Sequence, residues 1–218
     1  MAASDATRAR PAATRSPAAR ATRTPEGARR RILAQARALF ASRGYAATTT
    51  AALARAARVS EGLIFHWFSS KEELVATVGR EFAREVVDAM FAGRGPTDEP
   101  VPSLAVMLRR TFAYAREQRS LVRLLTLSPD PSSSPAARQA GRAAVLAPLT
   151  ATFAYRSARR RARPMDARIA AELMFALVEA ALVECHVFGD GAREEAYLRE
   201  TIRCVEGALA ARAPRRRP

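Results

Sequence analysis

Two short segments with helical periodicity, joined by a very tight turn, constrain the fold of this chain more than any other feature. They are predicted to be helices over about Thr49–Ala57 and Ser60–Trp67, with the step Arg58-Val59-Ser60 between them. A turn of this length forces the two helices to pack against each other and against a third element. The apolar residues spaced for that packing are Leu53, Ala57, Val59 and Ile64. The pattern predicts a helix-turn-helix unit, whose second helix fits the major groove of DNA, which is about 12 Å wide.

Longer helices are predicted on both sides of this pair. Thr24-Pro25-Glu26 supplies an N-cap, a proline for the first helical position and an acidic residue for the first turn, and Gly44 supplies the stop. Ser70-Lys71-Glu72-Glu73 has the capping-box pattern and is predicted to begin a helix that extends to about Phe91. The glycine- and proline-rich segment Gly93–Pro102 then interrupts the helical pattern, so we expect a domain boundary there.

The rest of the chain is predicted to form a larger helical domain over residues 103–212. Its expected helices lie near residues 103–118, 120–127, 136–162, 166–188 and 193–212. No strand or internal repeat is evident, and a composition rich in alanine and arginine with only 10 glycines favours helices. The expected fold class is all-α with about nine helices. Residues 24–70 form the three-helix DNA-binding domain and residues 71–92 a connecting helix.

The charge of the chain is strongly positive and unevenly distributed. Of the formal net charge of +15, residues 1–70 carry +9, from 12 arginines against three acidic residues. A basic first third is typical of a protein that binds nucleic acid. Residues 1–23 have no apolar periodicity and are predicted to be a disordered basic arm, and residues 213–218 a basic tail.

The candidate DNA contacts lie around the second helix of the pair. Once the apolar face is turned inward, Glu61, Gly62, Leu63 and His66 are left facing outward. Lys71, the single lysine of the chain, stands in the first turn of the next helix, where a cation is unfavourable unless a phosphate lies beside it. Thr48 and Thr49 stand similarly at the start of the preceding short helix.

The stretch "RILAQARALFASRGYAATTTAALARAARVSEGLIFHWFSSKEEL" resembles the N-terminal domain of the tetracycline-repressor (TetR) family, from Ile32 to Leu74. The matching elements are Leu39-Phe40, Gly44-Tyr45, Thr48-Thr49, Leu53-Ala54, Ala57, Val59-Ser60, Gly62, Phe68 and Lys71-Glu72-Glu73-Leu74. The resemblance implies that Ser60 also belongs to the DNA-binding surface.

Two positions depart from the family pattern. The family usually has glycine where this chain has Arg58. If the backbone there needs a positive φ, arginine is strained, and its guanidinium can compensate by reaching DNA. The family usually has a phosphate-binding tyrosine where this chain has Phe65. The missing hydroxyl shifts more of the expected contact to His66.

The resemblance further implies that residues 103–212 form a ligand-binding and dimerisation domain, whose last two helices pair across a two-fold axis. The segment Ile169–Phe188 is apolar on nearly all sides and must be covered on more than one of them. The expected interface residues are Ile169, Leu173, Leu177, Leu198, Ile202, Val205 and Leu209. A monomer with one additional covering helix remains the alternative.

Bulky residues of the same domain are the candidate walls of an effector pocket: Met107, Phe112, Leu125, Phe153, Met174, Phe175 and His186. Cys185 and Cys204 show no disulfide framework and no metal-ligand spacing, so neither a metal nor a cofactor is expected. Three glutamates within the most apolar segment argue against a membrane span, and no secretory signal is evident. The protein is expected in the cytoplasm, associated with the nucleoid.

The resulting hypothesis is a homodimeric, sequence-specific DNA-binding regulator that is not an enzyme. It is expected to repress from an inverted-repeat operator in double-stranded DNA until a small apolar effector, of unknown identity, releases it. Two alternatives remain. One is a non-specific or architectural DNA-binding protein, which the arginine-rich arm favours. The other is an enzymatic C-terminal domain, for which the sequence shows no supporting motif.

Overall fold

A computed structural model describes residues 24–93, 101–127, 134–159 and 164–210 of the chain. The predicted arm (1–23) and tail (213–218) lie outside the described residues. In the described residues the fold is entirely helical, with nine α-helices, one π-helical turn and no strand, which confirms the predicted fold class. None of these helices is both long enough and apolar enough to cross a membrane.

Three helices form the N-terminal domain: α2 (Pro25–Arg43), α3 (Thr50–Ala57) and α4 (Glu61–Trp67). The helices of the larger domain are α5 (Lys71–Phe91), α6 (Leu104–Glu117), α7 (Arg119–Leu127), α8 (Ser134–Ala158), α9 (Ala167–Val183) and α10 (Glu194–Leu209). A π-helical turn, η1 (Glu184–Phe188), continues directly from α9. The sequence predicts one uninterrupted helix there, because a π-turn leaves no distinct signature in the apolar periodicity.

Side-chain caps fix where the helices of the first domain begin. Hydroxyl oxygens of Thr24, Thr49 and Ser60 each accept a hydrogen bond from a backbone N–H three residues later, at 3.1–3.2 Å. Each such bond satisfies a donor that the first turn leaves free. The predicted capping box at Ser70 forms on one side only. Ser70 accepts from the Glu73 amide, but the Glu73 carboxylate accepts from the backbone N–H of Ser69 at 2.7 Å.

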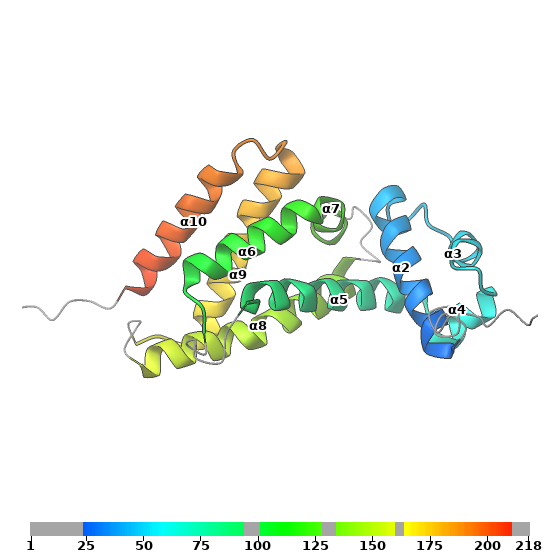
Figure 1. Cartoon of the computed structure of the whole chain (residues 1–218), viewed down its shortest axis with the longest axis horizontal. Coiled ribbons are helices and arrows are strands. Elements are labelled where there is room, and N and C mark those ends of the chain that lie inside the picture. The colour runs from blue at the N-terminus through cyan, green and yellow to red at the C-terminus, as the bar shows by residue number, and fades with distance from the viewer. Residues whose placement is uncertain (1–23, 94–100, 128–133, 160–163, 211–218) are drawn as a thin grey trace, which may run out of the picture.

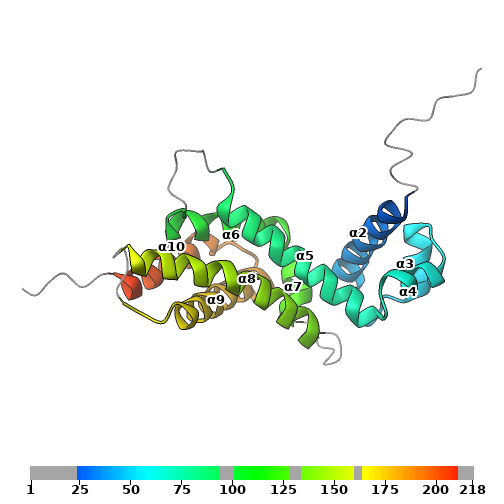
Figure 2. The same ribbon diagram turned by 90° about the horizontal axis from the view of Figure 1, so that it is seen from below.

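Two hydrophobic cores share the helix α5. The first core lies among α2, α3, α4 and the N-terminal half of α5, where Leu74, Val75 and Val78 are buried. The second lies among α5, α6, α8, α9 and α10, with Ala83 and Met90 on the C-terminal half of α5. Figure 1 shows α5 extending from the N-terminal domain into the larger one, and Figure 2 shows α8 lying along it. Displacement of α5 must therefore be felt by both cores.

Helix α7 provides a second link between the domains. It packs against α2, and its residues Leu121 and Leu124 belong to the first core although they follow the second domain's helix α6 in sequence. The larger domain thus holds the N-terminal domain at two places, through α5 and through α7.

Candidate DNA-binding surface and effector cavity

The sequence left open whether the backbone at Arg58, in the turn between α3 and α4, has a positive φ. In the structure this residue is in the left-handed conformation. Arg58 has φ 55° and ψ 52°, and it is the only non-glycine residue with a positive φ among the described residues. The backbone N–H of Val59 bonds to Ala54 O at 3.0 Å, and Arg31 Nε donates to Ala57 O at 3.3 Å. These contacts close the end of α3 and hold Arg58 in a conformation that favours glycine. The Arg58 side chain is exposed.

Helix α4 presents one face to the outside. Ile64 is 2% exposed and packs inward, whereas Glu61, Gly62 and His66 are exposed and Phe65 is 49% exposed. Leu63 is half-buried on the same helix. The space in front of Gly62 is open, because a Cβ at that position would meet no atom within 4 Å. A backbone without a side chain at an open surface allows another molecule to approach closely.

Two side chains from α3 and its N-cap lie beside this face. Thr49 caps α3 and is exposed, and Thr50 Oγ1 donates to Glu61 Oε2 at 2.9 Å, which holds the Glu61 carboxylate against α3. Thr48 lies elsewhere. It is 1% exposed, and its hydroxyl donates to Gly44 O at 2.8 Å within the domain. Its side chain is therefore occupied in holding the chain between α2 and α3.

Lys71 lies at the first turn of α5. Its ammonium lies 4.0 Å from the centre of the Tyr45 ring, whose hydroxyl donates to Glu72 Oε1 at 2.7 Å. This hydrogen bond lowers the pKa of Glu72 below its usual value. The Tyr45 ring thus orients the Lys71 ammonium at the N-terminus of α5. At such a position a cation and the backbone N–H groups can together bind a phosphate.

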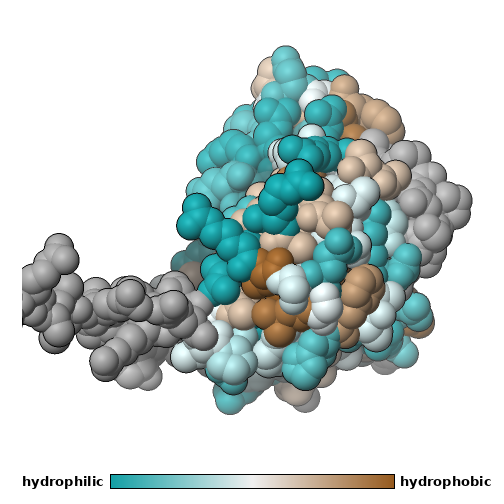
Figure 3. All heavy atoms as spheres, turned by 90° about the vertical axis from the view of Figure 1, so that its right-hand side faces the viewer, coloured by the Kyte–Doolittle hydropathy of each residue, from teal (hydrophilic) through white to brown (hydrophobic). Residues whose placement is uncertain are grey.

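The surface at this end of the molecule is largely hydrophilic, with an apolar patch among polar side chains (Figure 3). Of the ten sequence-predicted DNA contacts, nine are exposed or half-buried on α3, α4 and the segments beside them, and Thr48 is buried. The structure brings those nine to one end of the chain: Thr49, Arg58, Ser60, Glu61, Gly62, Leu63, Phe65, His66 and Lys71.

The larger domain contains a cavity of about 760 Å³. Its wall is formed by residues of α5, α6, α7, α8 and α9 with the first residue of η1, and it is mainly apolar. Of the seven predicted wall residues, Leu125, Met174 and Phe175 line it. The other four lie away from the wall: Met107, Phe112 and Phe153 are fully buried in the second core, and His186 belongs to η1.

Polar side chains also belong to this wall, and the sequence pattern did not predict them. Arg142, Glu179 and Glu184 line the cavity, and the Arg142 guanidinium lies 5.1 Å from the centre of the Phe175 ring. Gln139, Thr111 and Thr126 line it as well. No polar residue of α8 was among the predicted wall residues, because a polar position on a long helix is normally solvent-facing and no local signal marks it as part of a cavity.

The expected interface residues separate into two groups. Ile169, Leu173 and Leu177 form a stripe along α9 and are 55%, 67% and 37% exposed. Leu198 and Val205 on α10 are only 6% and 5% exposed and pack in the chain's own second core, where Ile202 and Leu209 are partly buried. The outward apolar stripe is therefore on α9, while this face of α10 packs inward.

Polar contacts cross from the N-terminal domain to the larger one at Arg37. Its Nη1 bonds to both Glu85 oxygens at 2.7 Å, and its Nη2 donates to Tyr114 Oη at 3.2 Å and Gln118 Oε1 at 3.0 Å. The Tyr114 hydroxyl in turn donates to Glu85. Burial, with Glu85 nearby, raises the pKa of Tyr114. The guanidinium of α2 thus joins α5 and α6 through one network.

The comparisons with known proteins agree with this geometry. Residues 32–78 match the family model of bacterial regulatory proteins of the tetR family. No curated protein matches the chain. Among solved structures, GusR from Salmonella enterica is 24% identical with a TM-score of 0.67, over 86% of this chain and 98% of GusR.

FadR from Bacillus subtilis, solved in complex with stearoyl-CoA, is 16% identical with a TM-score of 0.65, over 83% of this chain and 99% of FadR. The fatty acid degradation regulator FadR from Bacillus halodurans is 17% identical with a TM-score of 0.66, over 83% and 99% of the two chains. At these identities the structures establish a shared fold.

The fold, the turn at Arg58 and the outward face of α4 define a helix-turn-helix DNA-binding protein with a second helical domain. Over residues 32–78 the chain thus has a domain that matches the tetR family of bacterial regulatory proteins.

Proposed function

We propose that this protein is a homodimeric repressor that binds an inverted-repeat operator in chromosomal DNA and is released by a small, mainly apolar effector. The observation that carries the proposal is the position of α5. Phe82, Ala83, Val86 and Met90 of this helix line the cavity, and its first half packs in the core of the DNA-binding domain. A molecule that fills the cavity therefore contacts the same rigid element that supports α4.

Effector release requires that the effector binds one arrangement of the DNA-binding domains better than another. The composition of the cavity wall supports such a coupling, because the wall includes α7 as well as α5. Leu125 and Thr126 line the cavity, while Leu121 and Leu124 of the same helix pack against the N-terminal domain. A ligand that moves α5 relative to α7 changes the direction in which α4 points.

The lining of the cavity favours a mainly apolar effector that carries a polar group. A volume of about 760 Å³ lies in the range of sites for drug-sized molecules. Arg142 offers a cation for an anionic group, and Phe175 and Phe82 offer apolar surface. Stearoyl-CoA in the complex of Bacillus subtilis FadR supports fatty acids and acyl-CoA thioesters as the first class to test.

The dimer is proposed on the exposed stripe of α9. Ile169, Leu173 and Leu177 follow a spacing of four residues and form one line of exposed apolar surface, which a symmetric contact would cover. In a two-fold dimer the two α4 helices meet successive major grooves, about 34–36 Å apart or a multiple of that distance. The operator should therefore be an inverted repeat.

Footprinting of the purified full-length protein on DNA from its own genome tests the repressor proposal. The expected result is a protected inverted repeat whose half-sites share one face of the duplex. Protection without sequence preference would instead indicate an architectural DNA-binding protein.

Titration of the operator complex with fatty acids and acyl-CoA thioesters of increasing chain length tests the effector class. We expect at least one ligand to weaken operator binding by about 5- to 150-fold. Val86→Trp places a large ring in the cavity and should strongly weaken this response, whereas Val106→Trp on an exposed position of α6 should keep it. An unchanged response in Val86→Trp would remove the cavity from the proposal.

A further inference from the structure

The corner between α9 and α10 has an unusual backbone. The last turns of α9 continue into the π-helical turn η1, where Cys185, His186 and Val187 are all buried. Gly189 ends this turn. A Cβ there would lie 2.9 Å from Glu184 O and 3.0 Å from Cys185 O, so a larger residue would displace the backbone. Short π-helical segments occur frequently at functional sites, because they redirect side chains that a regular helix would separate.

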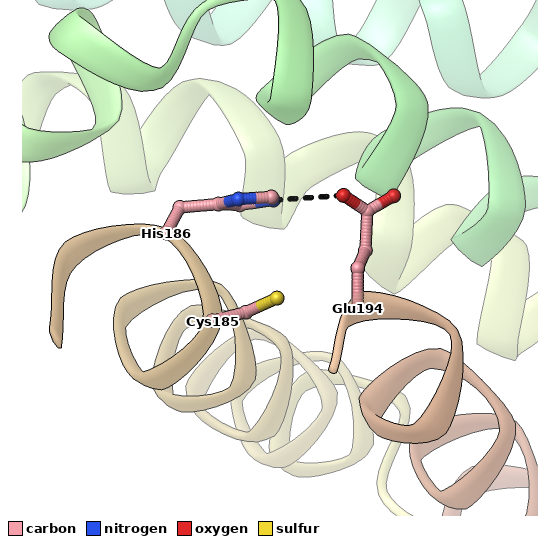
Figure 4. A group of neighbouring side chains, drawn as sticks. All are labelled: Cys185, His186 and Glu194. Carbon is pink, nitrogen blue, oxygen red and sulfur yellow. Dashed lines mark ion pairs between the residues drawn. The ribbon is translucent and has the colours of Figure 1, made fainter. Parts of the chain in front are cut away.

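The redirected side chains converge with one from the next helix. A ring nitrogen of His186, the Sγ of Cys185 and a carboxylate oxygen of Glu194 all lie within 4.8 Å of one another. Figure 4 shows the ring and the carboxylate facing each other, with the sulfur of Cys185 pointing toward the space beside them. The distance from His186 Nε2 to Glu194 Oε2 is 3.6 Å, too long for a normal hydrogen bond.

His186 has no hydrogen-bond partner in this position. Its side chain is 0% exposed, and both Nδ1 and Nε2 are buried without a donor or an acceptor. Most buried polar side chains have a partner, and an unsatisfied imidazole calls for a physical explanation. A neutral imidazole carries a lone pair on one ring nitrogen, through which it can bind a metal ion.

We propose that Cys185, His186 and Glu194 bind one divalent metal ion of the Zn²⁺ type. Thiolate, imidazole and carboxylate are the three kinds of ligand that Zn²⁺ takes in proteins, whereas Mg²⁺ and Ca²⁺ prefer oxygen alone. Bonds of about 2.0–2.3 Å in a tetrahedral site place the ligand atoms roughly 3.3–3.6 Å apart. The distance from His186 Nε2 to Glu194 Oε2 already lies at that value, and the Cys185 Sγ lies within 4.8 Å of the other two ligand atoms.

The surrounding charges fit a site with two anionic ligands. Arg116 Nη1 bonds to Glu194 Oε1 at 2.9 Å, which leaves Oε2 directed toward His186 and would hold the carboxylate in position for a metal ion. Arg119 also lies near the cluster and opposes a bound cation. A thiolate at Cys185 together with the Glu194 carboxylate offsets the two positive charges of the ion.

A metal ion at this site would stabilise the region where the ends of four helices lie together. Cys185 and His186 follow α9, Glu194 begins α10, Arg116 belongs to α6, and Arg123 of α7 donates to Val187 O at 3.1 Å. The three ligands are separate from the apolar cavity, because none of them lines its wall. The proposal is therefore independent of the effector and of the repressor function.

Cobalt substitution of the tag-free, full-length protein tests the proposal. After treatment with a chelator, the protein is titrated with Co²⁺ and then with Zn²⁺ in competition with a chromogenic chelator. We expect one ion per chain, a thiolate-to-cobalt charge-transfer band and displacement of Co²⁺ by Zn²⁺. A wild-type protein that shows no such band, or that binds no ion at micromolar concentration, overturns the proposal without reference to any variant.

Matched variants identify the ligands. Cys185→Ser should abolish the charge-transfer band, and His186→Asn and Glu194→Gln should each weaken Zn²⁺ binding by more than about tenfold. Cys204→Ser removes the exposed cysteine and His66→Asn the exposed histidine. Neither should change the cobalt charge-transfer band or the affinity for Zn²⁺. Circular dichroism verifies that each variant is folded. A band that persists in folded Cys185→Ser, or that disappears in Cys204→Ser, contradicts the assignment.

Discussion

Arg58 has a left-handed backbone conformation that favours glycine, but it carries a long cationic side chain. An L-residue in the left-handed region costs roughly 1–2 kcal/mol, and this chain accepts that cost at the centre of its helix-turn-helix unit. The guanidinium is exposed on the surface that carries α4. A residue that strains its own turn while adding charge to a proposed DNA surface has opposite effects on folding and on binding.

Arg58→Gly is therefore expected to raise the free energy of unfolding by about 1 kcal/mol and to weaken DNA binding. Chemical denaturation and a binding titration measure the two effects on the same preparation. Arg55→Ala, which removes an exposed charge from regular helix, serves as the control and should leave stability nearly unchanged. If Arg58→Gly binds DNA as tightly as the wild type, the guanidinium is not a contact.

Lys71→Ala should weaken binding to all DNA sequences about equally, because a phosphate contact carries no base information. The salt dependence of binding should become shallower by nearly one phosphate unit per subunit. Affinities measured at several salt concentrations give this slope. Arg109→Ala, an exposed charge on α6, is the matched control and should leave the slope intact. An unaltered slope in Lys71→Ala would remove it from the contacts.

His66→Ala should instead relax sequence preference, since His66 lies exposed on α4. A good contact to a base edge contributes about 1–3 kcal/mol to discrimination. The quantity to measure is the ratio of affinities for operator and random DNA. Equal losses on both DNAs would show that His66 only positions the protein.

At the scale of helices, the two domains are joined by α5, by α7 and by the Arg37 network. Arg37 is about one-quarter exposed and bonds to three side chains of the larger domain. An exposed ion pair contributes little, but a partly buried guanidinium with several acceptors contributes more. The network is thus expected to stabilise the contact between the domains.

A double-mutant cycle with Arg37→Ala and Glu85→Ala measures this contribution. We expect a coupling energy of about 1–2 kcal/mol, discounted for partial exposure. The pair Arg168–Glu172, which lies exposed within α9 at 2.7 Å, is the control and should show about 0.3–0.5 kcal/mol. Equal coupling in the two pairs would mean that the Arg37 network does not stabilise the domain contact.

At the scale of the whole molecule, the exposed stripe of α9 is the feature that a single chain leaves uncovered. Leu173 is its most exposed residue, at 67%. Leu198 on α10, which the sequence pattern also assigns to the interface, is buried in the chain's own core. The two leucines therefore predict different consequences when they are replaced by a charge.

Leu173→Arg should give a folded monomer with greatly reduced operator affinity, because it places an unpaired charge in the proposed dimer contact. Leu198→Arg should lower the thermal stability of the chain itself, because it buries the charge within one subunit. Sedimentation and thermal melting distinguish the two results. Val106→Arg on α6 is the exposed control. A wild type that is monomeric at micromolar concentration contradicts the dimer proposal.

The sequence alone determined the helices, their caps and the order of the helix-turn-helix unit. These features depend on contacts within a few residues along the chain, such as the Ser60 hydroxyl with the Leu63 amide. The outward face of α4 could also be predicted, since the helical repeat fixes which residues oppose Ile64.

The tertiary structure decided which of these residues meet across helices. Thr48 is buried because α2 and α3 close over it, and the α10 stripe with Leu198 faces inward because α6 and α9 pack against that helix. Arg142 lies on the wall of the cavity because α8 packs against α5 and α9. The Glu194 side chain lies close to Cys185 and His186 only because the π-helical turn and the loop after it reverse the direction of the chain. Helix angles and register arise from the packing of the whole core, and no local spacing in the sequence encodes them.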